Sequence, residues 1–173
     1  MTGSQPDFRS FVSQDWRAIC GVYASAAKVE LELTGTDPGA FRPMPVEEDL
    51  ETFLHLNTAL VACIDGRVVG FIAWRDRGEW VNSGYLSWLY IDPTHHRRGI
   101  GDLLLSRAME ALGSQAWTLV KQGNDPAIHL YKKHGMRIVR TRPAETRGYP
   151  HVELRMALPT SRKSDPDAPN FGG

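Results

Sequence analysis

Two glycines and two arginines stand together in the segment HRRGIGD, residues 96–102, between an apolar run that ends at Asp92 and a stripe of leucines at helical spacing. A strand that ends and a helix that begins here leave backbone N–H groups unpaired, and the positive end of the helix dipole lies at the same junction. Gly99 and Gly101 have no Cβ, so an anion can approach the backbone closely. The segment therefore predicts a phosphate site. The structural alternative is a tight strand-to-helix turn with two solvated arginines.

The segment does not match the two common nucleotide-binding motifs. A dinucleotide fingerprint needs a third glycine, where Leu104 stands, and an acidic residue about 20 positions later, whereas the next strand ends in Lys121. A nucleoside triphosphate loop needs G-x-x-x-x-G-K followed by Ser or Thr, which the sequence lacks. A nucleotide-binding domain is therefore the weaker alternative.

The segment His96-Arg97-Arg98-Gly99-Ile100-Gly101 resembles the signature Q/R-x-x-G-x-G/A of the GCN5-related N-acetyltransferase (GNAT) family, with histidine where Gln or Arg is usual. The stretches LYIDP before it and NDPAIHLYKKHGM after it resemble other recurring stretches of that family, and the resemblance covers residues 8–158. It implies an acetyl-CoA-dependent N-acetyltransferase, in which a primary amine of a small molecule or peptide attacks the thioester directly. The alternative is an acyl-CoA-binding regulatory module without turnover.

The resemblance also implies which residues bind acetyl-CoA. The pyrophosphate would lie on the amides from Arg98 to Asp102, with the Asp102 side chain directed away, and Arg97 or Arg98 would reach the outer phosphates. Main-chain groups of the preceding strand would pair with the pantetheine arm. The implied cofactor-binding residues are Leu89, Tyr90, Ile91, Arg97, Arg98, Gly99, Ile100, Gly101, Asp102, Asn124 and Tyr131.

Tyr131 is the candidate catalytic acid, because it stands at the tyrosine position of the family's recurring stretch. A phenol with a pKa of about 10 can protonate a thiolate whose acid has a pKa of about 8.5. The alternative is a tyrosine packed in the core. Asp125 and Pro126 already supply a helix cap and a first-turn proline, so Asn124 is not needed as the cap. The resemblance implies that Asn124 hydrogen-bonds the pantetheine, and the alternative is a simple turn residue.

The sequence does not single out a general base. Many family members carry a glutamate early in the fourth strand, where Tyr85 stands here. Glu30, Glu32, Glu79 and His151 are the candidates, each with a solvated or structural alternative, and a chain of waters is a further possibility. No metal site is expected, because the six histidines have no carboxylate–histidine spacing of a common site.

Aromatic residues dominate the segments that would form the acceptor pocket. They favour a bulky or aromatic amine over a small polar one, although a Trp or Tyr at strand spacing is usually core. The candidate wall residues are Tyr23, Phe41, Trp74, Trp80, Tyr85, Trp88 and Tyr149. Pairing into a homodimer is implied only by related domains.

The elements that would position these residues form an α/β (α+β) fold of the GNAT type, with a mixed, mostly antiparallel sheet of about six to seven strands flanked by about four helices. Asp65-Gly66 predicts a hairpin turn, Asp15 a helix cap and Pro45 a helix start. Leu50, Phe53, Leu54 and Leu56 are expected to be buried on one helix, and Leu103, Leu104, Ala108 and Leu112 on another. The predicted strands lie near residues 8–12, 59–64, 67–74, 85–91, 116–121, 136–142 and 151–158, and the last two enclose a loop.

Composition sets the wider limits. The 173 residues suit one domain, expected over residues 8–158, with disordered ends at 1–7 and 159–173. Lys plus Arg number 20 and Asp plus Glu number 20, so no nucleic-acid partner is expected. No apolar run or signal-peptide core indicates a membrane, which makes a cytoplasmic protein the expectation. Cys20 and Cys63 are expected to be buried reduced thiols, with a disulfide or a catalytic thiol as alternatives.

Overall fold

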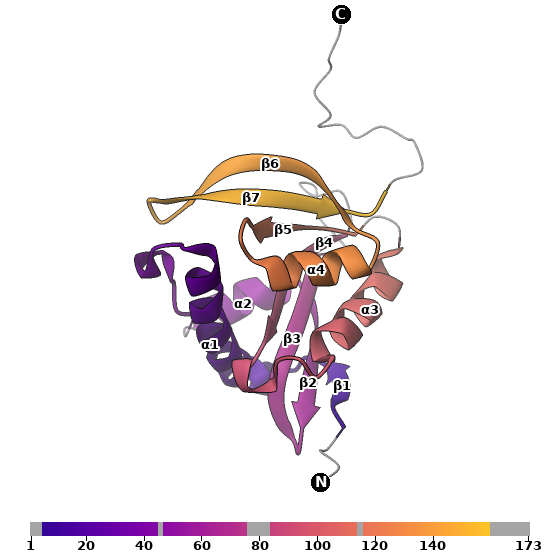
Figure 1. Cartoon of the computed structure of the whole chain (residues 1–173). Coiled ribbons are helices and arrows are strands. Elements are labelled where there is room, and N and C mark those ends of the chain that lie inside the picture. Colours follow the sequence, from indigo (N-terminus) through magenta and orange to yellow (C-terminus); the bar gives the residue numbers. More distant parts are fainter. Residues whose placement is uncertain (1–4, 45–46, 76–83, 114–115, 160–173) are drawn as a thin grey trace, which may run out of the picture.

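The computed structural model describes residues 5–44, 47–75, 84–113 and 116–159. Within them the elements follow the predicted order of strands and helices (Figure 1). The helices are α1 (Trp16–Thr34), α2 (Glu47–Leu56), α3 (Ile100–Leu112) and α4 (Asp125–Lys133). The strands are β1 (Asp7–Ser10), β2 (Thr58–Ile64), β3 (Arg67–Arg75), β4 (Tyr85–Ile91), β5 (Trp117–Lys121), β6 (Arg137–Thr146) and β7 (Tyr149–Ala157). Most of the two ends predicted to be disordered, and Pro45, lie outside the described residues.

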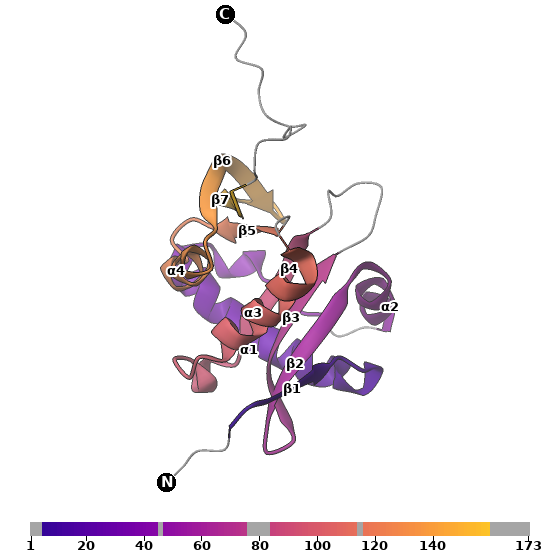
Figure 2. The ribbon, with the colours of Figure 1, turned by 90° about the vertical axis from the view of Figure 1, so that its right-hand side faces the viewer.

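The seven strands form one sheet in the order β1-β2-β3-β4-β5-β7-β6. Only β4 and β5 pair in parallel, so the predicted mixed and mostly antiparallel sheet is confirmed. The β6–β7 hairpin and the turn between β2 and β3 lie at opposite ends of the molecule in both views (Figures 1 and 2).

Two tight turns join the hairpins. At the predicted Asp65-Gly66 turn both residues have positive φ, 49° and 74°, as a type I′ turn requires. The predicted loop between the last two strands is wrong, because β6 and β7 continue through Pro143 and Pro150. Pro143 lies in an edge strand, and β5 pairs with β7 only from residue 153 onward, so neither proline breaks the ladder between β5 and β7.

The helices bury narrower stripes than their sequences predicted. On α3 the buried residues are Ile100, Leu104, Leu105 and Ala108, while Leu103 is 42% exposed. On α2 Phe53 is buried, whereas Leu54 and Leu56 are 45% and 38% exposed. Leucines at the border of an apolar stripe fit the helical period equally well, so periodicity alone did not exclude them.

Asp15 joins β1 to α1 in a way that differs from the predicted helix cap. Its carboxylate accepts two hydrogen bonds from the Arg9 guanidinium, at 2.7 and 2.8 Å, and one from the Val12 amide at 3.0 Å. These contacts, the Arg9 hydrogen bonds above all, lower the pKa of the Asp15 carboxyl. The residue therefore caps the short turn before α1 and makes no side-chain cap to α1 itself.

Each face of the sheet carries its own buried cluster. Adjacent residues of β3 show the alternation, since Ile72 packs toward α3 and Phe71 toward α1, and both are fully buried. The cluster with α3 and α4 includes Leu86, Leu104, Leu105, Tyr131, Met136 and Met156. The cluster with α1 and α2 includes Trp16, Ile19, Val22, Phe53, Val61 and Phe71. The helices are thereby fixed on the two faces.

Both cysteines are free; Cys63 is buried and Cys20 is partly buried. Burial raises the pKa of both thiols, that of Cys20 to about 11. Among the described residues, no helix has the length and apolar character needed to cross a membrane.

Candidate functional site

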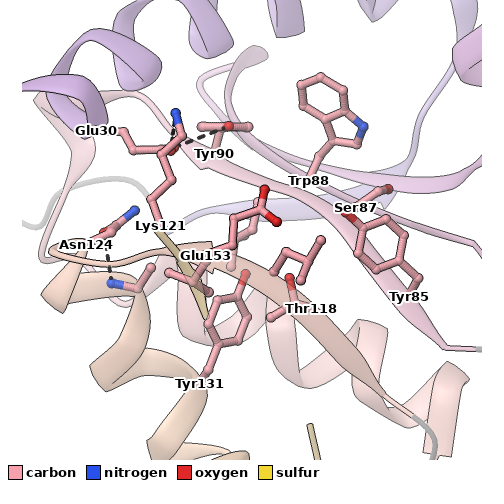
Figure 3. A pocket seen from close by; sticks show the side chains of 14 residues that line it. Glu30, Tyr85, Ser87, Trp88, Tyr90, Thr118, Lys121, Asn124, Tyr131 and Glu153 are labelled. Atoms are coloured by element: carbon pink, nitrogen blue, oxygen red, sulfur yellow. Dashed lines mark hydrogen bonds and ion pairs between the residues drawn. The ribbon is translucent and has the colours of Figure 1, made fainter. Parts of the chain in front are cut away.

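A cavity opens where β4 and β5 separate. Their parallel pairing consists of Tyr85 with Trp117 and Leu86 with Thr118, after which the described residues of the two strands pair no further. The space that follows has a volume of about 190 Å³. Figure 3 shows side chains from both strands, from α1, α4 and β7 around it. The lining includes Glu30, Tyr85, Ser87, Trp88, Leu89, Tyr90, Thr118, Lys121, Asn124, Tyr131 and Glu153.

A β-bulge decides which side chains of β4 face which helix. Ser87 is the extra residue relative to β3, and its hydroxyl lies 2.6 Å from Oδ1 of Asn57, just after α2. Beyond the bulge Trp88 and Tyr90 pack with α1, and Leu89 packs with α3. The side chains of this part of β4 thus belong to the two cores, and its main-chain groups line the edge from which β5 has moved away.

The chain between β4 and α3 takes a left-handed conformation at two positions, Arg97 with φ 63° and Gly99 with φ 75°. Nε2 of His96 lies 2.9 Å from the carbonyl oxygen of Ile91, which fixes the start of the loop to the end of β4. The first helical hydrogen bond of α3 ends on the Gly99 carbonyl, so the amides of residues 99–102 precede it. Such a row of amides at a helix N-terminus has the form of an anion site.

The side chains around this loop differ in what they contact. Those of Arg97 and Arg98 are exposed. The Asp102 carboxylate points to α4, with Oδ2 at 2.8 Å from Nζ of Lys133 and Oδ1 at 2.8 Å from Nε2 of His134. These hydrogen bonds lower the pKa of the Asp102 carboxyl. Its charge is therefore matched by Lys133 of α4.

Tyr131 reaches the cavity from α4. The residue is only 6% exposed, and Figure 3 shows its hydroxyl directed into the cavity. Burial raises the pKa of the phenol to about 12, and the neighbouring Thr118 hydroxyl opposes the shift. The ring of Tyr131 thus packs in the core while its hydroxyl faces the cavity. Packing in the core and a role as catalytic acid are therefore compatible.

Asn124 is the N-cap of α4, which corrects the expectation that Asp125 fills this position. Its side-chain oxygen accepts a hydrogen bond from the Ala127 amide at 3.3 Å, and Pro126 stands in the first turn. Asn and Asp are equally good caps, so a shift of one residue was not visible in the sequence. The capping role uses the oxygen of the carboxamide and leaves its NH₂ group toward the cavity (Figure 3).

Glu30 of α1 bridges the gap between the separated strands. Its carboxylate lies 3.3 Å from Nζ of Lys121 on β5 and 3.4 Å from the hydroxyl of Tyr90 on β4. Burial, with the charge of Glu30 second, raises the pKa of Tyr90 well above its usual value. Of the predicted base candidates, Glu30 is the one that the structure brings into the cavity.

The other candidates lie elsewhere. Glu32 is exposed, Glu79 lies outside the described residues, and Nε2 of His151 is 3.5 Å from Glu153. Glu153 itself lines the cavity, and Oε2 accepts hydrogen bonds from Arg142 at 2.8 and 3.1 Å. The sequence analysis missed Glu153. Its signal was the alternation of the final strand, which places it two residues after His151 on the same face.

The aromatic residues predicted to line the acceptor pocket lie in different places. Tyr23 lies 5.9 Å from Phe41, 5.3 Å from Trp88 and 5.1 Å from Tyr90, measured between ring centroids, and so forms a cluster beside the cavity. Trp74 is buried in the core. Tyr85 stacks on Trp117 at 4.5 Å and still lines the cavity, whereas Trp80 lies outside the described residues.

The tip of the β6–β7 hairpin contacts the loop between α1 and α2. Arg147 donates a hydrogen bond of 2.7 Å to the carbonyl of Phe41. A Cβ at Gly39 would collide with the hydroxyl and ring of Tyr149, so this tyrosine packs directly on the glycine. Two segments far apart in the sequence thereby meet beside the aromatic cluster.

Within the described ranges, no three His, Cys, Asp or Glu side chains gather as metal ligands would.

Comparison with known proteins gives two kinds of likeness. A family model, the acetyltransferase (GNAT) family, matches residues 28–136. An N-alpha-acetyltransferase of Sulfurisphaera tokodaii is 33% identical over 96 residues, which are 46% of this chain. The match spans 56% of that relative's length.

Solved structures share the fold. The ribosomal-protein-S18-alanine N-acetyltransferase of Escherichia coli superimposes with a TM-score of 0.67 at 18% identity, over 93% of this chain and 97% of the other. The protein yncA of Salmonella typhimurium, solved with its cofactor acetyl-CoA, gives a TM-score of 0.65 at 21% identity, over 94% and 99%. At these identities the likeness establishes the architecture.

Proposed function

Because this chain belongs to the acetyltransferase (GNAT) family, we propose that it transfers the acetyl group of acetyl-CoA to a primary amine of a small molecule or peptide. The observation that carries the proposal is the separation of β4 from β5 after Leu86 and Thr118. It leaves the edge of β4 without a paired strand among the described residues, and we propose that acetyl-CoA would lie along this edge, from the amides at the start of α3 to the phenol of Tyr131.

The loop before α3 fits the phosphates of the cofactor. The amides from Arg98 to Asp102 would hold the pyrophosphate, with Gly99, Ile100 and Gly101 between them. A Cβ at Gly101 would lie 3.5 Å from the Leu130 side chain, an ordinary contact, so packing alone does not require glycine there. The signature that this segment resembles likewise accepts Gly or Ala at this position. The exposed side chains of Arg97 and Arg98 would reach the outer phosphates.

The edge of β4 fits the pantetheine arm. Alternate main-chain groups of Leu89, Tyr90 and Ile91 face away from β3, on the side where β5 has diverged. An extended arm carrying amide groups can pair with such an edge as an added strand does. The NH₂ group of Asn124 would donate to the same arm from the opposite side. One of the β4 amides would hold the thioester oxygen.

Acetyl-CoA supplies an acetyl thioester, and the amine of the acceptor replaces its sulfur. Tyr131 would donate its phenol proton to the leaving sulfur. The raised pKa keeps the phenol protonated at neutral pH, and the same burial raises the proton affinity of a thiolate beside it. A carboxylate of Glu30 or Glu153 would take the proton that the amine loses, and solvent returns a proton to the phenolate.

The test mixes the purified protein with acetyl-CoA and a panel of amines, follows thiol release, and measures CoA binding by titration. Amine-dependent release that falls in Tyr131→Phe supports the proposal. Binding of CoA without release across the panel would instead indicate the regulatory module without turnover. A protein that binds no CoA would overturn the assignment of the glycine loop.

A further inference from the structure

A second cavity lies next to the first. It also has a volume of about 190 Å³, and Trp88 lines both. Its remaining lining comes from α1, the segment before α2, α2 itself and the end of β3. These residues are Tyr23, Arg42, Met44, Asp49, Thr52, Phe53, Leu56, Asn57 and Arg75. Two small spaces that share a wall residue suit a small acceptor with two chemically different ends.

Among the described residues, the second cavity is lined by two arginines, Arg42 and Arg75, and one carboxylate, that of Asp49. Arg42 and Asp49 approach each other, with NH2 and Oδ1 3.3 Å apart. Arg75 has no such partner within the part of the chain that the structure describes. Its guanidinium lies over the Tyr85 ring at 5.7 Å from the centroid, and its buried Nε makes no hydrogen bond there. A partly buried guanidinium of this kind favours an anionic ligand, because an unpaired buried charge is unfavourable.

The first cavity offers the opposite chemistry. Glu30 and Glu153 present carboxylate oxygens to it, each already held by one cation, Lys121 or Arg142. Carboxylates are acceptor-only groups with several lone pairs, so oxygens paired with one cation can still accept hydrogen bonds from an amine. An amine is therefore recognised in the first cavity and an anion in the second.

The wall between the two ends is apolar and aromatic. Tyr23 and Trp88 meet edge to face at 5.3 Å between centroids, and Phe53 is 5% exposed. Tyr85 lies beside both spaces, since it lines the first cavity and its ring contacts the guanidinium of Arg75, which lines the second. A carboxylate on Arg75 and an amine in the first cavity would thus both lie beside Tyr85.

We propose that the acceptor is a free amino acid with an apolar side chain. Its amine would lie between Glu153 and Tyr131, its carboxylate on Arg75, and its side chain against Tyr23, Phe53 and Trp88. This inference rests on the proposed acetyl transfer and adds the substrate class. It distinguishes a free amino acid from an amine without a carboxylate and from the amino end of a peptide.

The test uses matched acceptors, namely L-methionine, L-leucine and L-phenylalanine, their carboxamides, and short peptides that begin with the same residues. Thiol release gives kcat/KM, and calorimetry with CoA-saturated protein gives acceptor binding without turnover. The free acids should exceed the carboxamides about ten- to a hundredfold in both, as expected for a hydrogen bond to a charged group. Arg75→Gln should remove that preference and leave the KM for acetyl-CoA unchanged.

Two further variants serve as comparisons for Arg75→Gln. Arg42→Gln should reduce the preference less, because Arg42 is already paired with Asp49. Arg107→Gln is the matched control, since this arginine lies over the Phe8 ring and lines neither cavity. If carboxamides or peptides serve as well as free acids, or if Arg75→Gln folds normally and keeps the preference, the inference fails while acetyl transfer stands. If no amine is acetylated, the proposed function fails and calorimetry alone decides the carboxylate preference.

Discussion

Nε2 of His134 lies 2.8 Å from Oδ1 of Asp102, and this contact joins the end of α4 to the first turn of α3. Lys133 binds the other carboxylate oxygen at 2.8 Å. Because Tyr131 stands three residues before His134, the contact fixes the phenol relative to the amides that we assign to the cofactor phosphates. The acidic residue beside the proposed anion site is thereby explained as a connection between two helices.

Asp102→Asn should lower the free energy of unfolding at pH 7 by about 0.5–1 kcal/mol, the range of a partly exposed ion pair. The folded-state pKa of Asp102 is lowered, so its stabilising effect is present above the unfolded pKa of about 3.9 and is lost as the pH falls through the folded value. Urea unfolding at pH 7 and pH 3 measures both. Asp65→Asn, in the exposed β2–β3 turn, is the control, and an equal effect in both variants would contradict the prediction.

Gly101→Ala should leave CoA binding intact and should not destabilise the protein, because the signature that this segment resembles accepts either Gly or Ala at this position. The new Cβ meets Leu130 and Ile91 at ordinary distances of 3.5 and 3.7 Å, and alanine in a helix is favoured over glycine by about 0.5–1 kcal/mol. Gly21→Ala in α1 is the matched control, because its Cβ meets nothing within 4 Å. Thermal melts should show both variants at least as stable as the parent. A fall in CoA affinity in Gly101→Ala, without one in Gly21→Ala, would contradict the prediction.

Tyr131→Phe should lower kcat about a hundredfold or more, as for loss of a general acid, while the KM for acetyl-CoA changes little. The expectation follows from the position of the hydroxyl in the cavity and of the ring in the core. Since burial raises the pKa of this phenol to about 12, the wild-type kcat should show no alkaline loss from it up to about pH 10. Initial rates from pH 7 to pH 10 test this, and a kcat unchanged by the substitution would exclude the acid role.

The protein should lose stability above pH 10 because of its buried phenols. Tyr23, Tyr85, Tyr90 and Tyr131 all have raised pKa values, with burial as the first cause. A group whose pKa is higher in the folded state than in the unfolded state stabilises the fold below the unfolded-state pKa, here near 10. This stabilisation is lost as the pH rises toward the folded-state pKa. For Tyr131 the slope is up to about 1.4 kcal/mol per pH unit. Urea unfolding at pH 9 and pH 11 should show a smaller loss in Tyr131→Phe, and an equal loss would argue against its burial.

Local signals predicted the parts of the fold that depend on neighbouring residues. Asp65-Gly66 determines a type I′ turn by its own conformational preference. The predicted stripe on α3 was right for Leu104 and Ala108, which are buried, and wrong for Leu103, which is exposed. The glycine loop was recognisable for the same reason. Where two residue types serve one role equally well, as with Asn124 and Asp125 at a cap, the sequence could not choose between them.

Features that depend on register between distant strands were not predictable in the same way. Glu153 enters the cavity because β7 pairs with β5 at Lys121, and nothing near Glu153 in the sequence indicates that partner. Pro143 and Pro150 suggested a loop because prolines end most strands, yet the strand order places them where no ladder bond to β5 is lost. The position of Arg75 over the Tyr85 ring, with no carboxylate partner among the described residues, also emerged only from the assembled structure.

The contact between Arg147 and the Phe41 carbonyl has a consequence for how this protein could diversify. The walls nearest the aromatic cluster come from the α1–α2 loop and the β6–β7 tip, whereas the glycine loop, the edge of β4 and Tyr131 belong to other segments. Loops accept substitutions and insertions more readily than the elements they connect. Changes confined to these two contacting segments would therefore alter the walls of the proposed amine pocket across descendants of this sequence and leave unchanged the segments that we assign to the acyl donor.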